Sequence, residues 1–153
     1  MIDNIDLQIL NALKNNARIN ASDIGAAINM SVSAVIERIK KMDAAGYIQR
    51  YTILLDHKKL GMDVAAYMSV SLEHPKFNDS FVEAVRQDPR IVECDYITGD
   101  FDFLLKVITY STDDLTAVLD MVKSLEGVSL TRTQMVLATY KNEVTALPAP
   151  GHS

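Results

Sequence analysis

The sequence of 153 residues has a single cysteine and no long hydrophobic run. One thiol, Cys94, cannot close an intramolecular disulfide or form half of a Cys-x-x-Cys pair, which excludes disulfide scaffolds and zinc ribbons. No window approaches the roughly 18 consecutive apolar residues of a membrane span. The start, Met1-Ile2-Asp3-Asn4, lacks the basic and apolar regions of a secretory signal. We therefore expect a cytoplasmic protein that has no membrane partner.

Common enzyme signatures are also absent. The sequence contains no G-x-S-x-G, H-E-x-x-H, Walker A or G-x-G-x-x-G motif. Cys94 lies between Glu93 and Asp95, which disfavour a thiolate, and we predict that it is a small core residue. His57 and His74 lie in polar loops. We expect no catalytic residues, no metal and no cofactor.

The net charge of -5 is unevenly distributed along the chain. Residues 1–60 hold eight basic and six acidic side chains, a net charge of +2. Residues 61–153 hold seven basic and fourteen acidic side chains, a net charge of -7. This division predicts two small units, of which only the first can approach a polyanion such as DNA.

Three short helices closed by a strand are predicted in the first unit. Asp3, Asn20 and Ser31 are the expected N-caps, with Asp6 completing a capping box at the first. Asn29 is expected to make the turn between the second and third helices. Gly46 is expected to end the third helix, and residues 47–55 are predicted to form a strand. The side chains expected to face inward are Ile5, Ile9, Leu13, Ile24, Ala27, Ile28, Val32, Val35, Ile36, Ile39 and Met42.

The hydrophobic period changes to two after a polar hinge over residues 56–61. The order strand, helix, strand, strand, helix, strand follows, with a capping box predicted at Ser111 and Asp114. This is a ferredoxin-like βαββαβ arrangement, in which two helices cover one face of a four-stranded sheet. The other face stays open, so we expect dimerisation through it. The predicted strands are 65–72, 91–98, 102–108 and 128–140, and the predicted helices are 77–85 and 111–125.

The second and third helices, with a short turn between them, predict a helix-turn-helix whose second helix enters the DNA major groove. Ser31, Ala34, Arg38 and Lys41 are expected on one face, opposite the buried stripe, with small residues first and cations later. Glu37 can accept a hydrogen bond from cytosine or pair with Lys41 one turn on. An ordinary three-helix unit with a solvated charged face is the alternative. The predicted DNA-binding residues are Ser31, Ser33, Ala34, Glu37, Arg38 and Lys41.

The segment from Thr98 to Asp102 places two carboxylates around Gly99 at the tip of a predicted hairpin. Backbone N–H groups at Gly99 can approach a ligand carboxylate, while an aspartate can receive an ammonium group. The loop can therefore hold the two charged ends of an amino acid. The alternative is that the loop is a simple hairpin turn. Two carboxylates at this spacing could also indicate acid/base catalysis or a divalent metal site, but no further acidic or histidine ligand lies in register with them.

The order of short motifs along the chain resembles the Lrp/AsnC family of bacterial and archaeal transcription regulators, the feast/famine proteins. The resemblance runs from about residue 2 to residue 141. The motifs are Asp3-Asn4-Ile5-Asp6, Ile9-Leu10, Ala17-Arg18-Ile19, Ser31, Glu37-Arg38-Ile39-Lys40-Lys41-Met42, Gly46-Tyr47-Ile48, Leu60-Gly61, Thr98-Gly99-Asp100-Phe101-Asp102 with the following Phe103 to Val107, Gly127-Val128 and Thr131-Arg132-Thr133.

The resemblance implies an α+β protein with an N-terminal winged helix-turn-helix domain and a ferredoxin-like (RAM-type) ligand-sensing domain. It also implies homodimers that assemble into octamers or higher rings, and an amino acid bound between dimers. The implied effector-binding residues are Tyr96, Thr98, Gly99, Asp100, Asp102, Thr133, Gln134 and Val136. The expected division is residues 1–48 for DNA binding, 49–63 for a linker strand and hinge, 64–142 for effector binding and oligomerisation, and 143–153 for a flexible tail.

These observations predict a homo-oligomeric, nucleoid-associated regulator that reads a pseudo-palindromic operator in double-stranded DNA. An amino acid effector is expected to bias its assembly or its DNA binding. The alternative is an amino-acid-binding regulatory subunit of a metabolic enzyme, because small ferredoxin-like domains also serve there. That alternative leaves the basic third helix unexplained.

Overall fold

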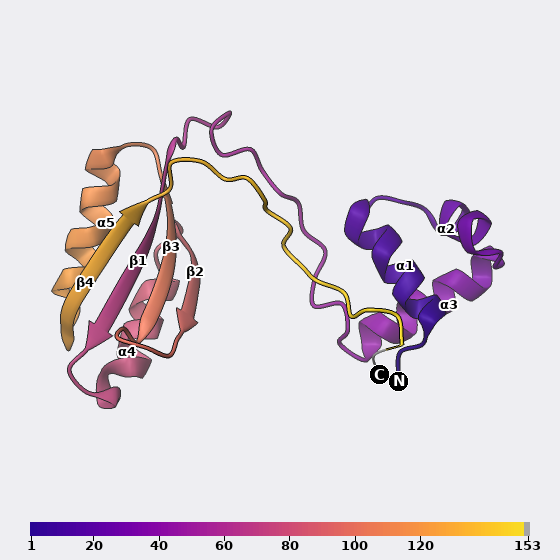
Figure 1. Cartoon of the computed structure of the whole chain (residues 1–153), viewed down its shortest axis with the longest axis horizontal. Coiled ribbons are helices and arrows are strands. Elements are labelled where there is room, and N and C mark those ends of the chain that lie inside the picture. The colour runs from indigo at the N-terminus through magenta and orange to yellow at the C-terminus, as the bar shows by residue number, and fades with distance from the viewer. Residues whose placement is uncertain (152–153) are drawn as a thin grey trace. The chain divides into compact units, whose positions relative to one another are not determined.

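The computed structural model describes residues 1–151, which form two compact units (Figure 1). One contains residues 1–54 and the segment from Lys141 onward, and the other contains residues 55–140. His152 and Ser153, at the end of the expected tail, lie outside the described residues. No helix within residues 1–151 has the length and apolar character needed to cross a membrane.

The first unit contains the three expected helices, α1 (Asn4–Asn15), α2 (Ala21–Ile28) and α3 (Val32–Ala44). The three predicted N-caps are confirmed, because Asp3, Asn20 and Ser31 each accept a hydrogen bond from a main-chain N–H in the first turn. The capping box at Asp3 is complete. The buried core of the unit consists of Ile9, Ile24, Val35 and Met42.

Several expectations for this unit were wrong. Ile5 and Ala27, which were expected to face inward, are exposed. Val32 and Ile36 are 45% and 40% exposed, because only the side of α3 that carries Val35 and Met42 packs against α1 and α2. Residues 47–55 form no strand, since no described strand lies beside them to supply the ladder hydrogen bonds. The apolar side chains in the later part of this segment are therefore exposed, namely Tyr51, Ile53, Leu54 and Leu55.

The second unit has the predicted βαββαβ order. Its four antiparallel strands lie in the order β2-β3-β1-β4, and α4 and α5 cover one face of the sheet (Figure 1). The elements are β1 (Val64–Leu72), the short 3-10 helix η1 (Pro75–Phe77), α4 (Asn78–Arg86), β2 (Ile91–Tyr96), β3 (Phe103–Thr109), α5 (Thr112–Ser124) and β4 (Val128–Met135).

The last strand is shorter than predicted. It ends at Met135, which pairs with Ala66, rather than at Tyr140. Because β1 begins at Val64, only two residues before Ala66, residues 138–140 have no partner on that strand. Val136 makes one last hydrogen bond, from its N–H to the carbonyl oxygen of Ala65. Beyond it, Tyr140 is exposed. The second strand likewise ends at Tyr96 instead of residue 98.

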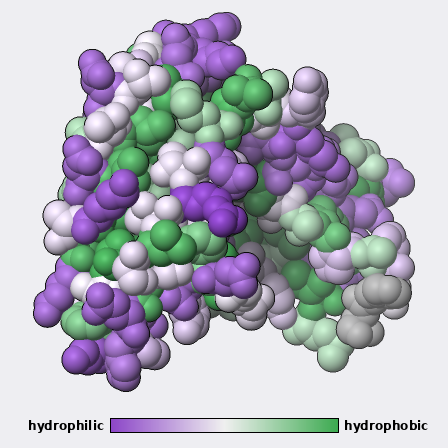
Figure 2. Space-filling view, turned by 60° about the vertical axis from the view of Figure 1, so that its left-hand side comes forward, coloured by the Kyte–Doolittle hydropathy of each residue, from purple (hydrophilic) through white to green (hydrophobic). Residues whose placement is uncertain are grey.

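Successive side chains of each strand point to opposite faces of the sheet, and those on the helix-covered face fill the layer between the sheet and the helices. Side chains from β1 and β3 interdigitate there with side chains from α4 and α5. On the surface, hydrophobic residues are interspersed with hydrophilic ones (Figure 2). The buried core residues are Ala66, Met68, Val70, Phe81, Val85, Phe103, Leu105, Val107, Leu115, Val118 and Val122.

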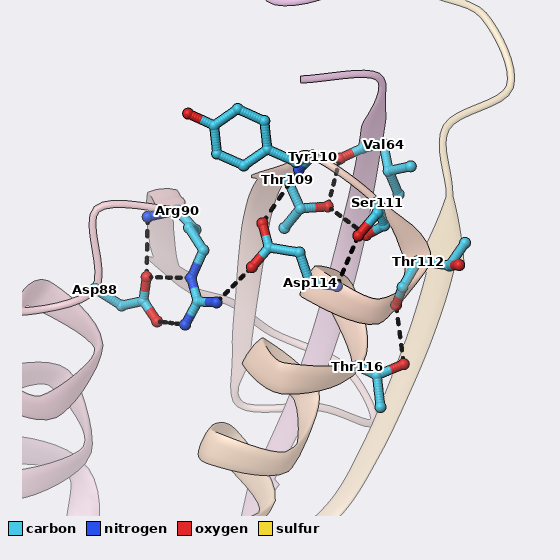
Figure 3. Close-up of polar contacts among 9 residues, drawn as sticks. All are labelled: Val64, Asp88, Arg90, Thr109, Tyr110, Ser111, Thr112, Asp114 and Thr116. Carbon is cyan, nitrogen blue, oxygen red and sulfur yellow. Dashed lines mark hydrogen bonds and ion pairs between the residues drawn. The ribbon is translucent and has the colours of Figure 1, made fainter. Parts of the chain in front are cut away.

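An arginine between two aspartates joins the start of β2 to the start of α5 (Figure 3). Arg90 donates to Asp88 at 2.7 and 2.9 Å and to Asp114 at 2.7 Å. Ser111 caps α5 as predicted, through the N–H of Asp114. The expected reciprocal half of the capping box was wrong, because the Asp114 carboxylate instead accepts from Arg90 and from the N–H of Tyr110.

Candidate DNA-binding and effector-binding sites

The turn between α2 and α3 depends on close backbone packing. Asn29 has a φ of 56°, the left-handed conformation expected for it. The N–H of Met30 donates to the carbonyl oxygen of Gly25 at 2.9 Å. A Cβ at Gly25 would lie 2.5 Å from the oxygen of Met30, so only glycine fits. Sequence reasoning missed Gly25, although a glycine inside a short helix is a signal of close approach.

The exposed face of α3 is centred on Ser33, Ile36, Glu37 and Lys40, opposite the buried Val35 and Met42. Lys41 forms an ion pair with Glu37 at 3.1 Å, one of the two arrangements expected for that glutamate. Ser31 Oγ, which caps the helix, lies 3.3 Å from Ser33 Oγ. The face thus presents small hydroxyls at the N-terminus of α3 and cations further along, the order that suits entry into a groove.

Arg38 lies on a different side of α3 from the one expected. It follows Val35 by three residues and precedes Met42 by four, which places it beside the buried stripe rather than opposite it. Its Nη1 lies 2.8 Å from Asp3 Oδ2 and 2.9 Å from Asp6 Oδ1. The expectation that the face shared by Arg38 and Lys41 lies opposite the buried stripe was therefore wrong.

Charge stabilises this contact between α3 and the start of α1. The hydrogen bond from Arg38 holds the pKa of Asp3 below its ordinary value, and the two aspartates raise the pKa of Arg38. These side chains also line a cavity of about 540 Å³ beside Met1, Lys41 and Tyr47. Arg38 therefore fixes α3 against α1 in this structure.

Within the loop between β2 and β3, three of the predicted effector residues lie together and exposed: Thr98, Gly99 and Asp100. Gly99 has a φ of +107°, a conformation that favours glycine. The side chain of Asp102 is bonded within the domain instead. Its carboxylate accepts a hydrogen bond from the N–H of Leu72 at 2.8 Å, next to an irregularity in β1. Its main chain also bonds to Val70 and Ile97. Asp100 is thus the carboxylate of this loop that faces solvent.

The remaining predicted effector residues do not lie on one face of the sheet. Thr133 pairs with Met68 and lies on the helix-covered face, whereas Gln134 pairs with Tyr67 and lies on the open face. Tyr96 pairs with Phe103 on the helix-covered face, with their ring centroids 5.1 Å apart. Val136 lies just beyond the end of β4. A single copy of the chain therefore does not bring all eight residues into one site.

A residue that sequence reasoning did not place in the site lies beside the loop. The guanidinium of Arg132, exposed on β4, lies 5.1 Å from the centroid of the Phe101 ring. The alternation of side chains along β4 predicts that Arg132 lies on the helix-free face of the sheet. Its closeness to Phe101 depends on the register between strands, which the sequence alone does not give. This region therefore presents a cation as well as the carboxylate of Asp100.

Cys94 is half-buried and packs against the core of the second unit, as predicted. Burial raises the pKa of its thiol, with a smaller contribution from Asp95. Among residues 1–151, no group of three or more His, Cys, Asp or Glu side chains is placed to hold a metal ion.

Two family models match the chain, one in each unit. The AsnC-type helix-turn-helix domain matches residues 2–43, and the Lrp/AsnC ligand binding domain matches residues 65–146. Among relatives, the HTH-type transcriptional regulator FL11 of Pyrococcus furiosus is 32% identical over 148 residues, covering 97% of each chain. The leucine-responsive regulatory protein of Klebsiella pneumoniae is 31% identical over 143 residues, covering 92% of this chain and 87% of its own.

Solved structures agree over nearly the whole length. A transcriptional regulator from Neisseria meningitidis in complex with L-methionine superposes with a TM-score of 0.91 at 27% identity, covering 97% of each chain. E. coli AsnC superposes with a TM-score of 0.87 at 28% identity, covering 95% of this chain and 98% of its own. Both units and their order along the chain are shared with these regulators. The chain therefore belongs to the Lrp/AsnC family and is a transcriptional regulator with a helix-turn-helix DNA-binding domain.

Proposed function

We propose that this regulator is a homo-oligomer that binds specific DNA sequences and whose assembly or DNA binding responds to an amino acid. The observation that carries the proposal is the pairing, in one chain, of an exposed helix-turn-helix face with a separate ligand-binding domain of the Lrp/AsnC type. An enzyme regulatory subunit would not require the first of these two units.

The DNA contacts are assigned to the exposed side of α3. Ser31 and Ser33 stand at its N-terminus, where a recognition helix meets base edges. Glu37, Lys40 and Lys41 follow on the exposed side, where the lysines can contact phosphate. Ala34 and Arg38, also predicted as DNA-binding residues, are half-buried, and Arg38 is paired with Asp3 and Asp6. Paired copies of α3 are expected to read two half-sites about one helical turn apart, or a multiple of it.

The effector is assigned to the loop between β2 and β3. The exposed Asp100 can receive the ammonium group of an amino acid, and backbone N–H groups near Gly99 can receive its carboxylate. L-methionine is the first candidate, because the similar regulator from Neisseria meningitidis was crystallised with it. Since the eight predicted residues do not meet in one chain, the site is expected to be completed by another copy.

Several features favour a homo-oligomer. Tyr51, Ile53, Leu54 and Leu55 leave an apolar run exposed in the single chain, which association would cover. The helix-free face of the sheet is a second candidate surface, and dimers that assemble into octamers or higher rings would use both. A ligand bound between copies would then shift assembly, which is linkage between the effector site and the DNA site. Such a regulator acts in the compartment that holds the chromosome.

The experiment that tests the effector assignment is thermal unfolding of the purified protein against each of the twenty amino acids. A ligand that binds only the folded state adds about 2.7 kcal/mol of stability at 100 times its dissociation constant. We expect a clear rise in the unfolding temperature with one or a few amino acids, methionine foremost. No shift with any of them at millimolar concentration would contradict an amino acid effector.

A further inference from the structure

Two apolar side chains lie in one row on the exposed side of α3. Residues four apart on a helix lie one above the other, so Val32, Ile36 and Lys40 form this row. Val32 is 45% exposed and Ile36 is 40% exposed, whereas Val35, on the packed side of the helix, is fully buried. Neither of the two exposed residues belongs to the apolar core of the unit. The packing of the three helices therefore leaves both side chains without a role.

The neighbouring row on the same side of α3 is polar. It consists of Ser33, Glu37 and Lys41, and the last two form an ion pair at 3.1 Å. Each row therefore ends in an exposed lysine. The outer side of α3 presents an apolar strip and a polar strip next to each other, with cations beyond both.

The apolar row lies on the part of a recognition helix that meets DNA bases. In a helix-turn-helix, the N-terminal residues of the second helix contact base edges in the major groove. Val32 is the first residue of α3, and Ile36 follows one turn later. The helical rise separates them by about 6 Å along the axis, which is less than two base-pair steps of about 3.4 Å. Both side chains can therefore reach base edges of the same half-site.

An aliphatic side chain in the major groove distinguishes between bases. The edges of guanine, cytosine and adenine present hydrogen-bonding groups there, whereas thymine also presents a methyl group. A polar edge covered by an aliphatic side chain loses its water without gaining a hydrogen bond, which is unfavourable. Contact with the thymine methyl instead removes apolar surface from water on both sides, which is favourable.

We propose that Val32 and Ile36 contact thymine methyl groups and so select A·T pairs at one or two fixed positions of each half-site. This inference rests on the proposed sequence-specific DNA binding. Lys40, at the end of the same row, can contact phosphate, which positions the helix and carries no sequence information. The apolar strip of α3 thus selects the sequence, while the lysine beyond it adds affinity for any DNA.

The test replaces thymine by uracil, which lacks only the methyl group, in a DNA site that the protein selects from a random-sequence library. Each thymine of one half-site is replaced in turn, and the dissociation constant is measured at about 0.15 M salt. We expect one or two positions at which the replacement weakens binding about fourfold. This change corresponds to about 0.8 kcal/mol, the value for one buried CH2 group. Replacement of the other thymines should have no effect.

Two variants assign the effect to individual side chains. Val32→Ala and Ile36→Ala remove the atoms that reach toward the bases, and alanine retains a high helix propensity. Each variant should bind thymine and uracil equally well at the position that its missing side chain contacts. A general weakening of α3 would instead lower the affinity for both DNAs and leave the difference between them unchanged.

Controls separate a methyl contact from other effects. Val92→Ala on β2 shortens a valine of similar exposure, 49%, in the other unit, and should change neither the affinity nor the effect of uracil. Lys40→Ala should weaken binding and retain the full effect of uracil, because a phosphate contact does not read the base. Circular dichroism checks that each variant is folded.

The uracil series with the wild-type protein decides the inference even without the variants. A selected half-site in which no replacement weakens binding would overturn it, as would an effect of uracil that both variants retain in full. Failure of the proposed function gives a different result, because the protein would then enrich no sequence from the library.

Discussion

Arg38 Nη1 on α3 lies 2.9 Å from Asp6 Oδ1 on α1, across thirty-two positions of sequence. Asp6 is only 9% exposed and belongs to the capping box that starts α1. The contact therefore links the recognition helix to the start of the domain at a half-buried position. It adds a polar contact to the apolar packing by which Val35 and Met42 hold α3 against the other helices.

Replacing Arg38 tests whether it holds α3 or contacts DNA. Arg38→Ala is expected to lower the unfolding temperature by a few degrees and to weaken DNA binding, because α3 loses its contact with Asp3 and Asp6. The dependence of affinity on salt should stay unchanged, since no phosphate contact is removed. Unfolding scans and DNA titrations at several salt concentrations measure both. An unchanged unfolding temperature with a flatter salt dependence would instead place Arg38 on a phosphate.

Lys40 is predicted to contact phosphate from the exposed side of α3. Lys40→Ala should weaken binding to all DNA sequences alike and reduce the slope of log affinity against log salt by about one. Lys123→Ala, on α5 of the other unit, is the matched control and should change neither quantity. If Lys40→Ala behaves like Lys123→Ala, the DNA-contacting face of α3 has been assigned wrongly.

The cluster around Arg90 predicts a loss of stability in acid. Hydrogen bonds from Arg90 lower the pKa values of Asp88 and Asp114 below the ordinary 3.8. Groups with a depressed pKa in the folded state stabilise the fold above their unfolded pKa, and this contribution is lost as the pH falls through their folded pKa. The wild type should therefore lose stability as the pH drops below about 4. Arg90→Gln should show a shallower fall in denaturant titrations over the same range; an equally steep fall would assign acid sensitivity to other groups.

The two aspartates of the loop between β2 and β3 are predicted to have separate roles. Asp102→Ala removes the acceptor for the N–H of Leu72 and should cost about 1–2 kcal/mol of unfolding free energy. Asp100→Asn should leave stability unchanged and weaken amino acid binding by about tenfold, because a charge-assisted hydrogen bond to the ammonium is lost. Chemical unfolding and calorimetric titration distinguish the two. If both changes weaken ligand binding equally and neither lowers the free energy of unfolding, the structural role assigned to Asp102 is wrong.

Local signals in the sequence predicted the helices and the order of the strands well. Each N-cap is set by one side chain and the amide three residues on, so Asp3, Asn20, Ser31 and Ser111 could be identified without knowledge of the fold. The period-two pattern of β1 similarly reports which of its faces is buried.

Features that depend on contacts between distant segments were not predictable. Helical spacing alone did not show that the partners of Arg38 would be Asp3 and Asp6, which lie on another helix. Residues 47–55 have strand-forming composition, yet a strand needs a neighbour, and no strand within residues 1–151 pairs with them. Thr133 and Gln134 were assigned to one site, whereas adjacent residues of a strand point to opposite faces.

The central claim, that paired copies of α3 bind a two-part DNA site, is tested most directly by footprinting the purified regulator on the DNA fragments that it selects from a random-sequence library. Wild-type protein should protect two half-sites about one helical turn apart, or a multiple of it, and Lys40→Ala should protect them only at higher concentration. Addition of the amino acid that raises the unfolding temperature should change the extent of protection. Absence of any protected sequence, at concentrations where the protein is folded and associated, would contradict the claim.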